Sequence, residues 1–100
     1  MAEDEKLIGA MEKSAKDSNA WVGLGDVWLS KQQWAQAAAR YTQAWSAGGV
    51  RREAELALHH AMALIKSGDA AQGRQMLEKI KSDKTAMEVA NLWRIYSVVP

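Results

Sequence analysis

Two adjacent histidines, His59 and His60, are the side chains best suited to bind a metal ion or transfer a proton, and the chain has no cysteine. Neighbouring residues on a helix point about 100° apart, so this pair cannot hold one metal ion together. Glu55 lies four residues before His59, and Asp26 would complete a carboxylate–histidine cluster if an earlier helix brought it close. Solvated polar side chains beside a partly buried His60 explain the pattern more simply. We therefore predict no catalytic residue, no metal site and no cofactor.

Other patterns that carry enzyme chemistry are missing from this sequence or weak. The sequence has no Ser, His and Asp spacing typical of a catalytic triad. Gly23 and Gly25 resemble part of a phosphate-binding loop, but no strand precedes them. Close packing between helices explains the two glycines better. An enzyme is the least favoured of the three interpretations that we consider.

Charge and aromatic content argue against nucleic-acid binding. Thirteen Lys and Arg residues are interspersed with 12 Asp and Glu residues, for a net charge of +1. Such a surface has no strong field for a polyanion. The chain has five tryptophans, and they could stack on bases, but they do not alternate with basic side chains on one surface. Trp21, Trp28 and Trp93 fall on expected core positions, and Trp34 and Trp45 should be partly exposed near helix ends.

The elements that position these residues should all be helices. The 100 residues include eighteen alanines and a single proline at the last position, and this composition favours helix throughout. Glycine and capping residues interrupt the chain near residues 16–19, 30–32, 48–49, 67–69 and 81–84. These breaks predict an all-α protein of five to six helices joined as antiparallel hairpins.

Apolar residues recur at helical spacing in the predicted helices. In the first helix the stripe is Leu7, Ile8, Met11 and Ala15, which should face inward. The predicted caps and stops are Asp17 or Ser18 for the second helix, Gly48 at the end of the third, Asp69 for the fifth, and Thr85 with Glu88 for the last.

A pattern of small and large residues occurs twice, displaced by 36 residues, as from Gly25 to Ala61. Small residues such as Gly25 and Ala37 let two helices approach closely, while Trp28 and Tyr41 fill the flanking space. The first set is Trp21, Leu24, Gly25, Trp28, Ala37, Tyr41 and Ala44, and the second is Ala57, His60, Ala61, Leu64, Gly73, Leu77 and Ile80.

These residues resemble the tetratricopeptide repeat, a helical hairpin of about 34 residues with Trp, Leu-Gly and an aromatic residue in its first helix and Ala, an aromatic residue and Ala in its second. The first repeat matches nearly every position, whereas the second has Ala57, His60 and Gly73 in place of the large residue, the leucine and the alanine. The resemblance implies a right-handed array of antiparallel helical hairpins, a TPR-like α-solenoid. The predicted organisation is one domain over residues 1–100, with an N-terminal half-repeat helix at 3–16, repeats at 18–51 and 52–82, and a C-terminal helix at 84–99.

The resemblance also implies non-catalytic protein–protein binding in a concave groove lined by the first helix of each hairpin. Family members that grip acidic C-terminal tails use a clamp of Lys, Asn and Arg, whereas this chain has Val22, Asp26 and His59 at those places. A peptide or helix of a partner protein with apolar anchors suits this groove better. A face that is simply solvated is the alternative. The predicted partner-binding residues are Asn19, Val22, Asp26, Ser30, Glu55, His59, Met62 and Lys66.

The C-terminal helix suggests a second, structural interpretation. Its polar residues cover only about a third of its circumference, and one neighbouring hairpin cannot cover the rest. Because a solenoid normally ends in a helix with a polar outer face, three explanations are open. The chain continues in a longer parent, the helix folds into the groove, or two copies pair through it. The predicted assembly residues are Leu92, Trp93, Ile95 and Tyr96.

Membrane insertion is not expected. Apolar stretches of a few residues are far shorter than the roughly 18–20 that cross a bilayer. The acidic start at residues 1–5 lacks the basic and apolar parts of a secretory signal. We therefore expect a cytoplasmic protein, with a piece of an exported parent as the alternative.

Overall fold

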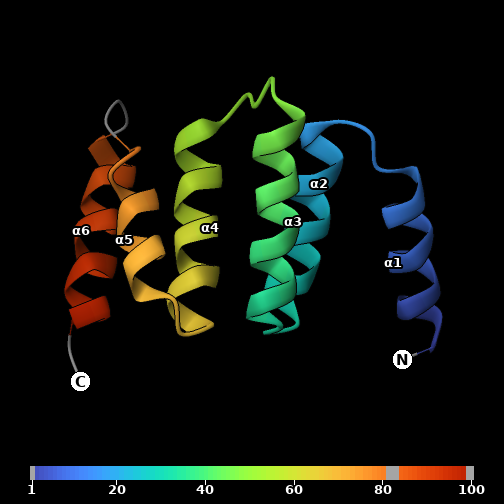
Figure 1. The fold of residues 1–100 in the computed structure, drawn as a ribbon, viewed down its shortest axis with the longest axis horizontal. Helices are drawn as coiled ribbons and strands as arrows, with labels where there is room; N and C mark the ends of the chain where they lie inside the picture. Colours follow the sequence, from blue (N-terminus) through green and yellow to red (C-terminus); the bar gives the residue numbers. More distant parts are fainter. Residues whose placement is uncertain (1, 81–83, 99–100) are drawn as a thin grey trace. The chain divides into compact units, whose positions relative to one another are not determined.

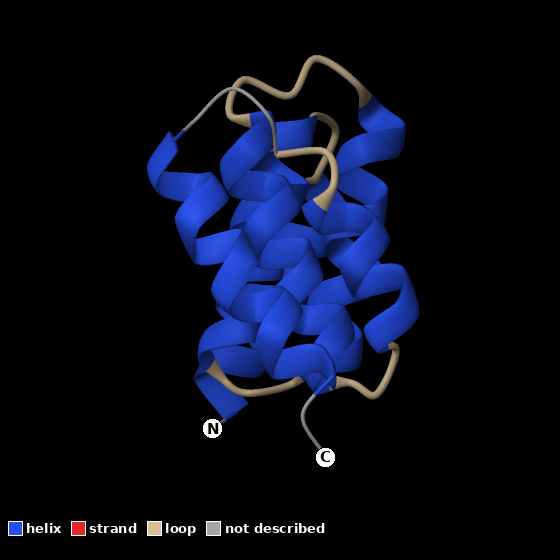
Figure 2. Cartoon of the chain, turned by 90° about the vertical axis from the view of Figure 1, so that its left-hand side faces the viewer, coloured by secondary structure: helices blue, strands red, loops and turns tan. Residues whose placement is uncertain are grey.

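The computed structural model of the chain describes residues 2–80 and 84–98, with side chains described for 6–80 and 88–97. These ranges contain helices and loops without a strand (Figure 2). The helices are α1 (Ala2–Ser14), α2 (Ser18–Ser30), α3 (Trp34–Ala47), α4 (Glu53–Lys66), α5 (Ala70–Leu77) and α6 (Lys84–Val98) (Figure 1). The all-α prediction is confirmed for the described ranges.

The chain divides into two compact units, Met1–Val50 and Arg51–Pro100. In the first unit, α2 and α3 form an antiparallel pair and α1 packs against α2 (Figure 1). In the second unit, α4 and α5 form an antiparallel pair, and α6 packs against both of them. Helices that are neighbours in sequence therefore supply most of the packing within each unit, as the short connections predict.

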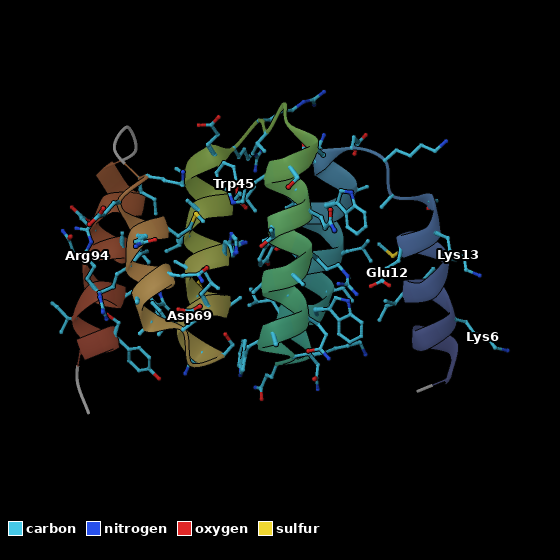
Figure 3. The ribbon with its side chains drawn as sticks, viewed as in Figure 1. Lys6, Glu12, Lys13, Trp45, Asp69 and Arg94 are labelled. Atoms are coloured by element: carbon cyan, nitrogen blue, oxygen red, sulfur yellow. The ribbon has the colours of Figure 1, made fainter. Side chains whose placement is uncertain are left out.

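Two aspartates start their helices as the sequence predicts. The carboxylate of Asp17 accepts a hydrogen bond from the Ala20 amide at 2.9 Å, at the start of α2. Asp69, labelled in Figure 3, accepts from the Gln72 amide at 3.2 Å, at the start of α5. Each cap satisfies an amide that has no partner inside the helix, which is worth about 1 kcal/mol. The predicted cap Thr85 has its side chain outside the described residues, and α6 itself begins at Lys84.

The two hairpins reverse direction through the same kind of turn. Gln32 follows α2 with φ of 60°, and Gly68 follows α4 with φ of 101°. In the first turn the Gln33 amide donates to the Trp28 carbonyl at 3.0 Å. In the second turn the Asp69 amide donates to the Leu64 carbonyl at 2.8 Å. This is the helix-ending arrangement in which one residue adopts the left-handed region. The two turns are therefore also displaced by 36 residues, with Gln32 in the first at the position of Gly68 in the second.

The core of the first unit is built around one tyrosine and one glycine. Leu24, Ala37 and Tyr41 are fully buried between α2 and α3. A Cβ atom on Gly25 would overlap the ring of Tyr41. The glycine therefore lets an aromatic ring lie directly on the backbone of α2, as the close approach predicted for Gly25 and Ala37 requires.

The second unit solves the same packing problem with the glycine on the other helix. A Cβ atom on Gly73 of α5 would lie 2.5 Å from Cγ1 of Ile65 and 3.2 Å from the carbonyl oxygen of Ala61, both on α4. Ala57, Ala61 and Leu77 are fully buried. The glycine at the alanine position of the second repeat is therefore a packing substitution that allows α5 to approach α4 closely.

Some expected core residues are less buried than predicted. Trp21, Trp28 and Trp93 are half-buried, as is usual for so large a side chain, and the largest fully buried side chains are instead Tyr41, Leu24, Leu56 and Leu77. In α1, Ile8 is buried but Leu7 is 62% exposed. Since α1 packs mainly against α2, only a narrow side of this helix is covered, and the prediction that Leu7 faces inward is wrong.

Candidate protein-binding surfaces

The outer side of α2 carries the first four predicted partner-binding residues. Asn19, Asp26 and Ser30 are exposed and Val22 is half-buried. They recur at three- and four-residue spacing, so they share the side of α2 that faces away from Leu24. The hydroxyl of Ser30 donates to the carbonyl of Val27 in its own helix at 2.7 Å.

Asp26 has a structural contact that the sequence did not reveal. The Tyr41 hydroxyl donates to Oδ1 of Asp26 at 2.6 Å. Burial of the ring is the main cause, and the neighbouring Asp26 carboxylate the second, that raises the pKa of Tyr41 well above its usual range. Tyr41 therefore stays a neutral donor, and Asp26 satisfies the one polar atom of a fully buried ring.

The outer side of α4 carries the other four predicted residues. Glu55 and Lys66 are exposed, and His59 and Met62 are half-buried. Glu55 accepts from Arg52 at 3.4 Å in an exposed ion pair, which contributes little to stability. Lys66 turns toward α6, where its Nζ lies 3.0 Å from the hydroxyl of Tyr96 and 4.9 Å from the centre of that ring. The structure thus joins Lys66 to a residue of the predicted assembly set.

The outer side of α6 is the most exposed apolar surface among the described residues. Leu92 is 66%, Ile95 60% and Tyr96 51% exposed. Leu92, Trp93 and Tyr96 line an open pocket of about 390 Å³. The rings of Trp93 and Tyr96 meet edge to face, with centroids 5.3 Å apart. Aromatic side chains in contact with each other beside exposed aliphatic ones are typical of protein-binding surfaces.

Hydrogen bonds hold α6 in the second unit through its opposite side. Arg74 of α5 donates to the Ser97 hydroxyl at 3.3 Å, and that hydroxyl donates to the carbonyl of Arg94 at 2.7 Å. Arg94, labelled in Figure 3, also donates to Asn91 at 2.8 Å along the helix surface. Ala90 is 1% exposed on this packed side. The apolar outer side is therefore presented by a helix that is anchored by specific contacts.

His60 belongs to the core of the second unit. It is 4% exposed, and burial lowers its pKa to about 4. His60 is therefore more deeply buried than the partly buried position that the sequence predicts. Among the described residues, no three metal-ligating side chains gather into a possible metal site.

A cluster of Glu12, Arg40 and Trp28 was missed by sequence reasoning. Oε1 of Glu12 accepts from Nε of Arg40 at 2.7 Å and from Nε1 of Trp28 at 3.3 Å. Figure 3 shows Glu12 on the side of α1 that faces α2. The hydrogen bond from Arg40 holds the pKa of Glu12 below its usual value. Because Arg40 lies 28 residues from Glu12, no local spacing signals this contact.

The predicted partner-binding residues are divided between the two units, four on α2 and four on α4. Within each unit they share the outer side of one helix, as the hairpin pattern requires. Of these eight, Asp26 and Lys66 are also engaged with tyrosines of their own unit. The groove that would combine both sets remains a prediction.

Comparison with protein-family models, with curated protein sequences and with solved structures finds no match for this chain. Within the part of the chain that the structure describes, no helix has the length and apolar character needed to cross a membrane.

Proposed function

We propose that this chain is a non-catalytic protein–protein interaction module. The observation that supports it best is the outer side of α6, where Leu92, Ile95 and Tyr96 are each more than half exposed. Single exposed apolar residues are ordinary on a protein surface, whereas a contiguous group on one helix marks a surface that another protein covers.

The architecture belongs to the same proposal. Each unit contains an antiparallel hairpin with a small residue where its two helices cross, and the same kind of turn joins the two helices of each hairpin. These features are those expected of two successive repeats in a right-handed TPR-like array. In such an array, packed helices hold the binding side chains in place, so that binding orders only the partner.

The sides of α2 and α4 that face away from their partner helices are candidates for further binding surfaces, one in each unit. Val22 on α2, and His59 and Met62 on α4, are half-buried among exposed polar residues, a mixture that suits a peptide with apolar anchors. Asp26 and Lys66 contribute less to these surfaces than the resemblance implies, because each already bonds a tyrosine.

Site-specific photo-crosslinking tests the proposal. A photoreactive residue is introduced in separate proteins at Leu92 for the α6 surface, at Asn19 for the groove and at exposed Gln36 of α3 as the matched control. We expect protein adducts from Leu92 and from Asn19, with none from Gln36. The mass of each adduct identifies the bound chain. Equal labelling at all three positions, or no adduct at any of them, would contradict the proposal.

A further inference from the structure

Helix α6 has apolar residues on two opposite sides, and its own unit covers one of them. The covered side contains Ala90 and is held to α5 through Ser97. Leu92 follows Ala90 by two residues, which turns its side chain about 200° around the helix. Leu92, Ile95 and Tyr96 accordingly remain 51% to 66% exposed although α6 is firmly packed.

Charges of opposite sign flank this exposed side along the helix axis. Glu88 is exposed one turn before Leu92. Tyr96 lies one turn after Leu92, and Lys66 of α4 lies against it, with Nζ 3.0 Å from the hydroxyl. Along α6 the order is therefore an acid, an apolar centre and a base.

We infer that this side of α6 binds the same side of a second copy of the chain, with the two helices antiparallel and the two-fold axis at Leu92. Four residues rise about 6 Å in a helix, so the axis brings Glu88 of each copy level with Tyr96 and Lys66 of the other. A parallel pairing would instead bring Glu88 near Glu88 and Lys66 near Lys66. The surface is thus complementary to itself in the antiparallel direction. This inference rests on the proposed function and names its partner.

The apolar centre and the charges have different roles in this dimer. Burial of Leu92 and Ile95 supplies the attraction, whereas exposed ion pairs are individually weak and mainly fix the direction. The two-fold axis places two Glu88–Lys66 pairs in the interface, so each substitution changes both of them. Because one helix side is smaller than a standard interface, the dimer should be weak and concentration-dependent.

Sedimentation equilibrium of the purified chain tests the dimer directly. From about 10 µM to about 1 mM, we expect the mass to rise from one chain toward two. Leu92→Glu should abolish this rise, and its 66% exposure means that the substitution leaves the fold intact. Circular dichroism and the melting temperature verify that fold.

A charge swap tests the antiparallel pairing. Glu88→Lys alone and Lys66→Glu alone should each raise the dissociation constant about tenfold, because two attractions become two repulsions. The two changes together should restore it. Matched controls are Glu53→Lys, an acid in the first turn of α4, and Lys13→Glu, a lysine in the last turn of α1. Neither control should change the dissociation constant.

Three results would overturn the inference. One is a mass of one chain at every concentration, another is a dimer that Leu92→Glu does not weaken, and the third is a double charge swap that fails to restore pairing. If the purified chain is monomeric while crosslinking at Leu92 captures a different protein, this inference fails and the proposed function stands. If neither experiment detects binding, both fail.

Discussion

His60 illustrates how one buried residue sets a pH dependence. The unfolded chain protonates this histidine near pH 6.5, whereas burial delays protonation in the folded chain to about pH 4. Between these values the unfolded state binds more protons, so the free energy of unfolding falls as the pH is lowered. The contribution of neutral His60 is complete above pH 6.5 and is lost on acidification toward pH 4.

We expect His60→Leu to remove most of this pH dependence. The wild-type chain should lose about 3 kcal/mol more than the variant between pH 7 and pH 4, measured by urea unfolding at each pH. Leucine is the residue at the equivalent position of the first repeat, Leu24, so it suits the core. The depressed pKa of Glu12 adds stability above its unfolded value of 4.5, which is lost at lower pH, but it acts equally in both proteins. If the free energy of unfolding varied with pH in the same way in both proteins, His60 would not be the cause of the pH dependence.

Asp26 and Lys66 show how one contact changes the interpretation of a residue. Both are exposed polar side chains on the outer sides of their helices, as the repeat pattern predicts. Each nevertheless bonds a tyrosine of its own unit. A binding defect after substituting Asp26 would therefore mix a lost contact with lost stability, which is why Asn19 is the better probe of the groove.

At the scale of helices, alanine substitutions at three glycines distinguish the effect of packing on stability from the effect of helix propensity. Gly25→Ala should destabilise the chain because the new methyl group overlaps Tyr41, and Gly73→Ala should do so because it meets Ile65 and Ala61. We expect about 1–3 kcal/mol for each in thermal or urea unfolding. Gly23→Ala is the matched control in α2, because nothing lies within 4 Å of its added Cβ. It should stabilise the chain by about 0.5–1 kcal/mol through helix propensity. Destabilisation by all three substitutions alike would contradict the packing argument.

At the scale of the whole molecule, the proposed array predicts that the two hairpins support one another. Successive repeats gain stability from their neighbours, so damage in one should spread to the next. Gly25→Ala in the first unit should therefore reduce amide hydrogen-exchange protection in α4 as well as in α2. Gly23→Ala should not reduce it in either. Protection of α4 that stays unchanged while α2 is weakened would indicate independent hairpins and would count against the array.

Much of the fold could be predicted from the sequence because its signals are local. The unbranched and alanine-rich composition predicts helices, and Asp17 and Asp69 are confirmed as their caps. Small residues at the crossings, such as Gly25 and Ala37, indicate where α2 and α3 approach each other. Caps and crossings depend on residue type and spacing within a few positions, so the sequence alone identifies them.

Other features were decided only by tertiary structure, because they join residues that are far apart in sequence. No spacing rule connects Glu12 to Arg40 or Tyr41 to Asp26, and a stripe of apolar residues does not reveal that Leu7 is left uncovered. The sequence by itself determined helices, caps and helix crossings, through the steric and hydrogen-bonding preferences of each residue. Tertiary structure decided which polar side chains are already engaged and which apolar residues of α6 stay exposed, since both depend on which helices pack together.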